Sequence, residues 1–228
     1  MATYSINKSF IISPAWTFVF YAANVLSGRA KLATDRTWTQ AYNKEQSLDI
    51  EDVHASRQGD PDAYKRLIER HQRRIGKIMW RFSRDPLVHE ELVQDVFVNA
   101  YLSIGTYRER APFEHWLIRI ATRAGYHYWK QQARQKNFER FSLEDWDRLA
   151  AETPEEIDSS RAAELLYNVL GQLPPRDRLV LTLRYLEGCD VAETAHRIGW
   201  TKSMVKVQTN RAKKKLQKLL SQIQRSPL

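Results

Sequence analysis

Apolar residues recur at steps of three and four in three successive segments, the spacing of one face of an α-helix. The first segment follows Asp60-Pro61, the second follows Asp85-Pro86, and the third starts at Pro112. An aspartate before proline is a typical helix start, because the carboxylate caps free N–H groups and proline fits the first helical position. The expected inward faces are Tyr64, Leu67, Ile68, His71, Ile75, Ile78, Met79 and Phe82; Val88, Leu92, Val93, Val96, Ala100 and Ile104; and Phe113, Trp116, Leu117, Ile120, Ala121, Ala124 and Tyr128. Three such helices could bury one core as a compact bundle.

A second group of helices is expected in the last third of the chain. Residues 161–172 form one helix, and a second ends at Gly188. A short helix of residues 191–198 follows Asp190, and a basic helix runs from residue 202 to about residue 220. No segment shows sustained alternation of apolar and polar residues, so the pattern predicts an all-α protein of two small helical domains.

Composition narrows the class. The chain has 228 residues with only 8 glycines and 8 prolines, which argues against a turn-rich β fold. Its one cysteine excludes a disulfide framework and zinc sites built from several cysteines. A hydrophobic fraction of 43% is enough for a core, and a net charge of +9 indicates a polyanionic partner. Nucleic acid is the simplest such partner, and an acidic membrane surface is the second.

Charge is unevenly distributed along the chain. Residues 115–140 are mainly basic, and residues 201–228 hold basic but no acidic side chains. Between these blocks lie Glu144, Asp145, Asp147, Glu152, Glu155, Glu156 and Asp158, against Arg148 alone. This order suggests two polyanion-binding modules joined by a flexible acidic linker. The expected boundaries are therefore 49–136 for the first domain, 137–160 for the linker and 161–228 for the second domain.

Residues 1–48 differ from the rest. Residues 10–26 are mostly apolar, but Ser13, Pro14, Thr17 and Asn24 interrupt them. This stretch is at the short limit for a membrane span and has no clear signal-peptide cleavage site. We expect an accessory helix or a poorly ordered extension of unknown role, with a signal, an anchor or an over-long gene start as alternatives.

The basic C-terminal helix completes a helix-turn-helix pattern. Gly199 supplies the turn, and Thr201 is expected to cap the second helix. Ala192, Ala195 and Ile198 are expected to face the core, with Val205 behind them. The first turns of the second helix would enter the DNA major groove, where Lys and Arg bind phosphate or guanine and Asn prefers adenine. The candidate residues are Thr201, Lys202, Ser203, Met204, Lys206, Val207, Asn210, Arg211 and Lys214. A solvated amphipathic helix is the alternative.

The third helix of the first domain interleaves cations with aromatic rings opposite its apolar face. Bases of melted DNA can stack on such rings while Lys and Arg follow the phosphates. The candidates on the helix are Arg119, Arg123, Tyr126, Trp129, Lys130 and Arg134. Tyr126 and Trp129 could instead belong to the core or to an interface. Gly125 is unfavourable in mid-helix and so indicates a close contact.

The second helix of the first domain has an acidic edge. Glu90, Glu91, Gln94 and Asp95 lie beside Val98 and Leu102. In a DNA-binding protein such an edge favours docking on a basic protein surface, with ordinary solvation as the alternative.

Several segments, in the same order and spacing, resemble bacterial RNA polymerase sigma factors of the sigma-70 family, and the extracytoplasmic-function (ECF) group in particular. Residues 90–97 and 116–121 resemble region 2, and residues 173–178, 183–188, 205–206 and 211–212 resemble region 4. The resemblance covers about residues 49–220. It implies promoter-specific initiation by a cytoplasmic protein that binds core RNA polymerase.

The resemblance also implies roles for particular residues. Glu91, Leu92, Gln94 and Asp95 would dock on the clamp helices of the β′ subunit. The loop with Tyr107, Arg108 and Arg110 and the following helix would capture the melted −10 element. Region 4 would read the −35 element as duplex and touch the β flap, and an anti-sigma factor is an expected partner. The free protein is expected to be a monomer.

This sequence departs from the family at Arg123 and His127, where members commonly have Asn and Asp, and at Met204 and Gln208, which replace Thr and Arg. Promoter sequence therefore cannot be transferred. The alternatives are a helix-turn-helix regulator acting on duplex DNA without polymerase, and a nucleic-acid enzyme. No nucleophile–base arrangement, phosphate-binding loop or metal-ligand spacing is present, so no catalytic residue, cofactor, metal site or small-molecule substrate is expected.

Overall fold

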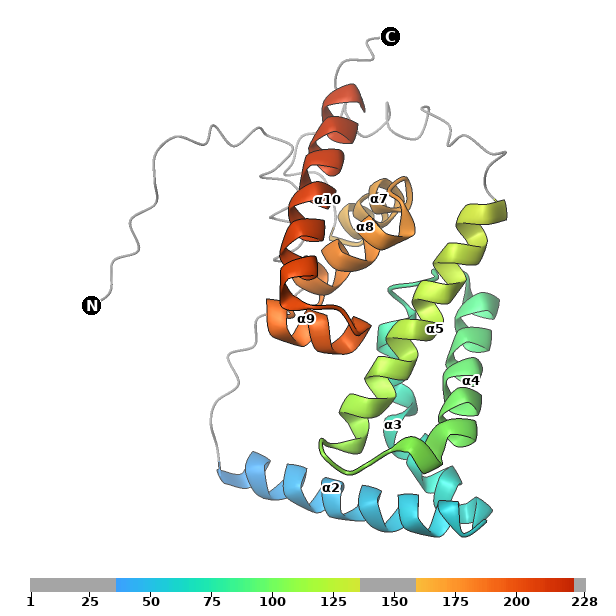
Figure 1. Ribbon diagram of the computed structural model, residues 1–228. Helices are drawn as coiled ribbons and strands as arrows, with labels where there is room; N and C mark the ends of the chain where they lie inside the picture. The colour runs from blue at the N-terminus through green and yellow to red at the C-terminus, as the bar shows by residue number, and fades with distance from the viewer. Residues whose placement is uncertain (1–35, 136–158, 224–228) are drawn as a thin grey trace, which may run out of the picture. The chain divides into compact units, whose positions relative to one another are not determined.

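The computed structural model describes residues 36–135 and 159–223, and the regular secondary structure within these residues is helical throughout (Figure 1). The prediction of an all-α protein is thus confirmed for this part of the chain. Two groups of helices follow each other in sequence.

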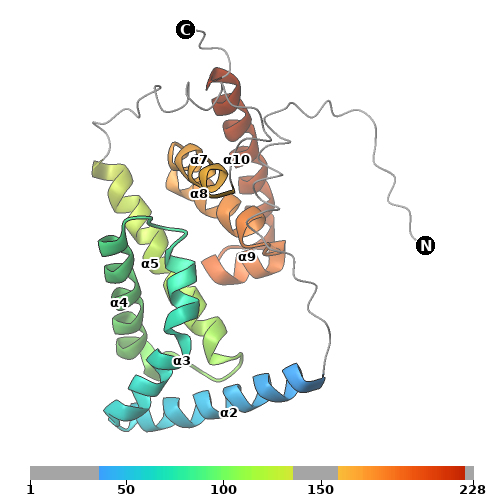
Figure 2. The same ribbon diagram turned by 180° about the vertical axis from the view of Figure 1, so that it is seen from behind.

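The first group consists of α2 (Arg36–Arg57), α3 (Pro61–Met79), α4 (Pro86–Ser103), the 3₁₀ turn η1 (Ile104–Thr106) and α5 (Phe113–Gln135). Helices α3, α4 and α5 run side by side, and α2 lies across one end of them (Figures 1 and 2). The sequence predicted three helices here, and the structure adds α2 as a fourth.

Both predicted aspartate caps are present. The Asp60 side chain accepts hydrogen bonds from the backbone N–H of Asp62 (2.9 Å) and Ala63 (3.3 Å). Asp85 does the same for the first turn of α4, at 2.9 Å and 3.2 Å. Each cap satisfies backbone donors that have no partner within the helix.

The core of this group follows the predicted faces closely. The buried side chains on the predicted faces of the three helices are Leu67, His71, Ile75, Ile78, Met79 and Phe82; Leu92, Val96, Ala100 and Ile104; and Phe113, Leu117 and Ala121. The remaining predicted positions are half-buried.

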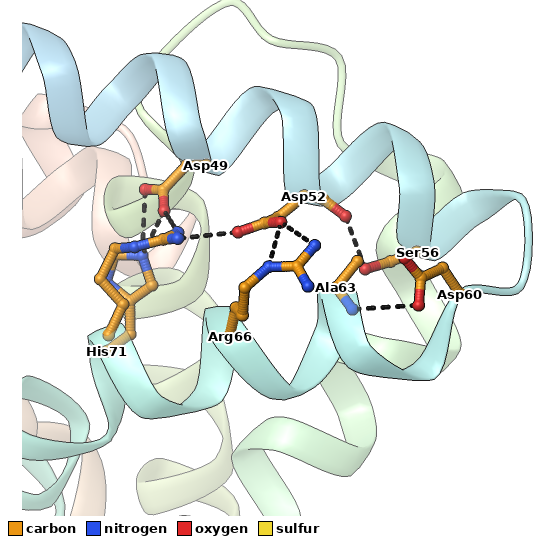
Figure 3. Close-up of polar contacts among 8 residues, drawn as sticks. Asp49, Asp52, Ser56, Asp60, Ala63, Arg66 and His71 are labelled. Atoms are coloured by element: carbon orange, nitrogen blue, oxygen red, sulfur yellow. Dashed lines mark hydrogen bonds and ion pairs between the residues drawn. The ribbon is translucent and has the colours of Figure 1, made fainter.

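Polar side chains join α2 to α3 (Figure 3). The His71 ring nitrogen lies 3.0 Å from both carboxylate oxygens of Asp49, and Arg70 bonds to Asp49 and, at 2.7 Å, to Asp52. Arg66 also binds Asp52, at 2.6 Å. Because Asp49, Asp52 and His71 are buried, these contacts fix how α2 packs on α3. Helix α2 is continuous across the expected boundary between residues 48 and 49.

Gly125 allows α5 to approach the end of α3 closely. A Cβ atom at this position would lie 2.3 Å from Cγ of Phe82, whose ring is buried against that of Trp129. The close contact that the sequence indicated at Gly125 is therefore present.

The second group consists of α7 (Ser159–Gly171), α8 (Pro175–Leu181), the π-helical turn η2 (Thr182–Leu186), α9 (Val191–Ile198) and α10 (Lys202–Ile223). Their bounds agree with the predicted helices to within a few residues. Most of the expected acidic linker lies outside the described residues, as does the apolar stretch of residues 10–26, and Ser159 and Ser160 belong to α7.

Candidate nucleic-acid interface

The loop between η1 and α5 is held against α2. Arg57 of α2 donates to the carbonyl oxygens of Tyr107 and, at 3.3 Å, Ile104, and its Nη1 lies 3.2 Å from Oε1 of Glu109. The two arginines of this loop, Arg108 and Arg110, are exposed. The loop therefore presents two cations from an anchored backbone.

Tyr107 does not share this exposure. Its side chain is buried, its hydroxyl donates to the Ala111 carbonyl at 2.7 Å, and its ring packs edge-on against Phe113. Burial raises the pKa of its hydroxyl, and the negative charges of Glu109 and Asp49 raise it further. In this conformation the ring supports the loop from within, and the DNA contact expected for Tyr107 stays a prediction.

The polar face of α5 keeps most of its predicted cations. Arg123, Lys130 and Arg134 are exposed, and Arg119 is half-buried. The half-buried ring of Tyr126 has Lys130 Nζ 5.8 Å from its centroid, so a cation and an aromatic ring lie together on the surface.

Trp129 belongs to the core. It is 4% exposed, and its Nε1 donates to the carbonyl oxygen of Phe82 at 2.8 Å. The stacking on a base expected for this ring stays a prediction, and in this conformation the ring is packed in the core. The sequence held a signal for this, because Phe113, Leu117, Ala121, Gly125 and Trp129 are four residues apart and form one buried row.

The helix-turn-helix is formed by α9 and α10. Asp190 caps α9 by accepting from the Glu193 N–H at 2.7 Å, and Gly199 ends it with a φ of 75°. Thr201 caps α10, accepting from the Met204 N–H at 3.1 Å. Gly199 is suited to this turn because a positive φ strains residues with a Cβ atom.

The packing of the two helices is close to the prediction. Ala195 and Val205 are buried and Ile198 is half-buried, but Ala192 is exposed, so its expected place in the core is wrong. Ala192 precedes the buried Thr194-Ala195 pair and therefore falls on another side of the short helix.

The candidate DNA-contacting residues of α10 are all exposed. Its buried face consists of Val205, Thr209, Ala212, Leu216 and Leu220, and the candidates lie outside this row. These exposed residues are Lys202, Ser203, Met204, Lys206, Val207, Asn210, Arg211 and Lys214, with Thr201 just before the helix.

The predicted acidic edge lies on the exposed side of α4. Glu91, Gln94 and Asp95 are exposed, and no ion pair joins the two carboxylates to another described residue. Leu92 is only 5% exposed, in agreement with its place on the expected inward face, and its expected contact with polymerase stays a prediction. The structure also exposes three aliphatic side chains of α4 that were not among the expected polymerase contacts: Leu87, Val98 and Leu102, at 79%, 57% and 77%.

The described residues hold neither a candidate metal site nor a membrane-spanning helix. Among them, no three His, Cys, Asp or Glu side chains are grouped in a way that would hold a metal ion. Within residues 36–135 and 159–223, no helix has both the length and the apolar character that a bilayer crossing requires.

Comparison with known proteins gives two family matches and several relatives. Residues 67–135 match sigma-70 region 2, and residues 163–216 match sigma-70 region 4. The ECF RNA polymerase sigma-E factor of Haemophilus influenzae is 32% identical over 161 residues, which cover 65% of this chain and 84% of the relative. The ECF RNA polymerase sigma factor SigE of Mycolicibacterium smegmatis is 26% identical over 88% of this chain and 78% of the relative.

Among solved structures, CnrH in complex with the cytosolic domain of CnrY is similar, with 24% identity, coverage of 76% of this chain and 97% of that one, and a TM-score of 0.49. The family assignment rests on the sequence matches, which place both regions in the expected order along the chain. The chain belongs to the sigma-70 family, in the ECF group of sigma factors, which bind core RNA polymerase and direct promoter-specific initiation of transcription.

Proposed function

We propose that this sigma factor acts in the cytoplasm as a non-catalytic subunit whose DNA and polymerase contacts are divided among three exposed surfaces. One observation carries the proposal. The cations expected to bind DNA are exposed on the 107–111 loop, α5 and α10, and the acids expected to bind polymerase are exposed on α4.

The −10 element is captured by the 107–111 loop and α5. Arg108 and Arg110 extend from the anchored loop, and Arg123, Lys130 and Arg134 follow on the helix. Stacking on Tyr126 adds a contact that tolerates any base, because every base has a π-face. With Tyr107 and Trp129 in the core, the surface is more cationic and less aromatic than the sequence predicted.

The −35 element is read as duplex by α10. Its exposed face combines Lys202, Lys206 and Arg211, which suit phosphates and guanine, with Asn210, which suits adenine. A helix of this kind fits the major groove of B-form DNA.

Core polymerase docks on the exposed side of α4. Glu91, Gln94 and Asp95 supply charge and hydrogen-bond acceptors, while Val98 and Leu102 supply apolar area around them. Basic clamp helices of the β′ subunit fit this composition, and region 4 is expected to touch the β flap. An anti-sigma factor is a further expected partner, and the free protein is expected to be monomeric.

Transcription with purified core polymerase tests the proposal. We expect promoter-dependent transcript only when the chain is added, and weaker core binding for the variant Asp95→Lys than for the matched surface variant Glu69→Lys on α3. If specific duplex binding occurs but transcript yield does not depend on the chain, the alternative of a regulator that acts without polymerase replaces this proposal.

Arg211 gives a second test, on the type of DNA contact. If Arg211→Ala weakens binding to all sequences equally and lowers the salt slope by about one unit, Arg211 binds a phosphate. Loss confined to one base position makes it a base reader. Lys65→Ala, which removes a cation from the surface of α3, is the control for net charge.

A further inference from the structure

An acidic residue stands between the two exposed arginines of the proposed −10 loop. Glu109 separates Arg108 from Arg110, and it is the non-glycine residue with a positive φ, 58°, among the described residues. Residues other than glycine rarely adopt this backbone conformation, and the surrounding contacts must compensate for its strain. Near DNA its negative charge would also be unfavourable, so its presence calls for a structural cause.

Helix α2 provides the compensating contacts. Arg57 Nη1 lies 3.2 Å from Glu109 Oε1, and His54 Nε2 lies 3.3 Å from the same oxygen. Arg57 also donates through Nε to the carbonyl oxygen of Ile104 in η1 and through Nη2 to that of Tyr107 in the loop. The fork of a guanidinium group can make these three contacts at once, whereas a lysine ammonium on a flexible stem cannot match their directions.

The contacts decide which side chains of the loop are available. Glu109 is turned to α2 and Tyr107 is buried, while Arg108 and Arg110 remain exposed. A loop without this anchor would have to order itself when DNA binds, and the loss of conformational entropy would weaken binding.

We propose that Arg57 is a positioning residue for promoter opening, which acts through Glu109 to hold the 107–111 loop in the conformation that presents Arg108 and Arg110 to the −10 element. This inference rests on the proposed role of the loop. It assigns to α2, a helix that contacts neither DNA nor polymerase in the proposal above, a part in −10 capture.

The sign of the effect at Glu109 separates positioning from simple electrostatics. If Glu109 contributed only its charge, its removal would strengthen DNA binding, because one negative charge near the phosphates would be gone. If it anchors the loop, Glu109→Gln weakens opening although the protein becomes more positive. The two explanations predict opposite changes.

The experiment uses the full chain assembled with core polymerase on the promoter that gives the strongest transcript. Open-complex formation is measured by permanganate reactivity of the melted strand, and core affinity and thermal unfolding are measured for the same variants. Arg57→Gln and Glu109→Gln are compared with Arg66→Gln. This control removes a guanidinium of α3 that binds Asp52 of α2, away from the loop.

We expect Arg57→Gln and Glu109→Gln to reduce open-complex formation at least fivefold with core affinity unchanged, and Arg66→Gln to change it less than twofold. Unchanged or increased opening with Glu109→Gln overturns the inference, and so does an equal loss of opening in all three variants, which would follow from general destabilisation of α2. The double variant Arg108→Ala, Arg110→Ala tests the underlying function separately. If it opens the promoter normally, the loop is not the −10 site. If the double variant does not open the promoter while Arg57→Gln and Glu109→Gln open it normally, only the positioning role of Arg57 is refuted.

Discussion

The contact between Gly125 and Phe82 gives the sharpest stability prediction. Replacing Gly125 with alanine ordinarily stabilises a helix by about 1 kcal/mol, because alanine loses less conformational entropy than glycine. Here the added methyl group would lie 2.3 Å from Cγ and 2.4 Å from Cδ1 of Phe82. Carbon atoms in contact are about 3.5–4.0 Å apart, so the ring or helix α5 must move by more than about 1 Å.

The surroundings leave little room for that movement. Phe82 is 2% exposed, its ring centroid lies 4.5 Å from that of Trp129, and its carbonyl oxygen accepts the hydrogen bond from Trp129 Nε1. Overpacking of a filled core costs about 1–3 kcal/mol, and we take the upper end because backbone and ring are both held. After subtraction of the helix-propensity gain, Gly125→Ala should destabilise the bundle by about 2 kcal/mol.

The assay is denaturant unfolding followed by circular dichroism, with Gly76→Ala as the matched control. Gly76 is also helical, but a Cβ there would be 3.9 Å from the His89 ring, which is an ordinary contact. The free energy of unfolding of Gly76→Ala should be about 0.5–1 kcal/mol higher than that of the parent. In a Phe82→Leu background the cost of Gly125→Ala should shrink, because the smaller side chain relieves the overlap. A Gly125→Ala protein as stable as the parent would refute the reasoning.

Two further changes test the polar docking of α2 and the base contacts of α10. Burial alone would raise the pKa of the Asp52 carboxyl, but hydrogen bonds and ion pairs with Arg66 and Arg70 outweigh it and hold the pKa below its usual value. The stability that this pairing contributes is present above about pH 4 and is lost as pH falls further. Asp52→Asn should therefore flatten the fall in unfolding free energy below about pH 4. Val207 is 49% exposed on the DNA-facing side of α10 and has no polar group, so it suits a thymine methyl. Replacing thymines of the −35 element by uracil should lower the DNA affinity of the parent protein about fourfold, which corresponds to about one buried methyl group. The same replacement should leave the DNA affinity of the Val207→Ala variant unchanged.

Sequence patterns predicted most of the helices because the determinants were local. The caps at Asp60, Asp85 and Asp190 act within three residues, and the rows of buried apolar side chains follow the helical repeat. Gly125 was also informative, because glycine in mid-helix is unfavourable unless something requires the space.

The sequence offered an accessory helix in residues 1–48 only as one alternative, and the place of α2 in the first domain was not predicted, for a physical reason. Its contact with α3 relies on Asp49 and Asp52 as well as on apolar side chains, and their partners Arg70 and His71 come from the next helix. A polar interface of this kind leaves no apolar stripe for periodicity to detect. The anchoring of Glu109 by Arg57 joins residues 52 positions apart in the sequence, and no local pattern indicates it.

It was harder to predict which side chains of the site point to the core and which to the surface. Trp129 was assigned to a surface by its neighbours, and the family resemblance gave Leu92 a docking role although periodicity placed it on the inward face. Each lies one or two turns from other buried residues on its own helix. A long aromatic or apolar side chain next to exposed cations or acids can still point inward, because helical position rather than sequence neighbourhood determines its direction.

The same principle determines which cations of α10 can meet DNA. Lys215 Nζ lies 2.6 Å from the carboxylate of Asp177, which is 1% exposed, and Lys213 Nζ lies 4.9 Å from the centroid of the Tyr185 ring. These two cations are engaged within their own helical group, whereas Lys206 and Lys214 are exposed, and Lys214 lies on the side opposite the buried face. The row of buried side chains fixes the rotation of the helix, and that rotation divides its cations into those that hold α8 and η2 and those available to phosphates. The DNA-binding surface of α10 therefore depends on the packing of Val205 and Leu216 as much as on the number of basic residues.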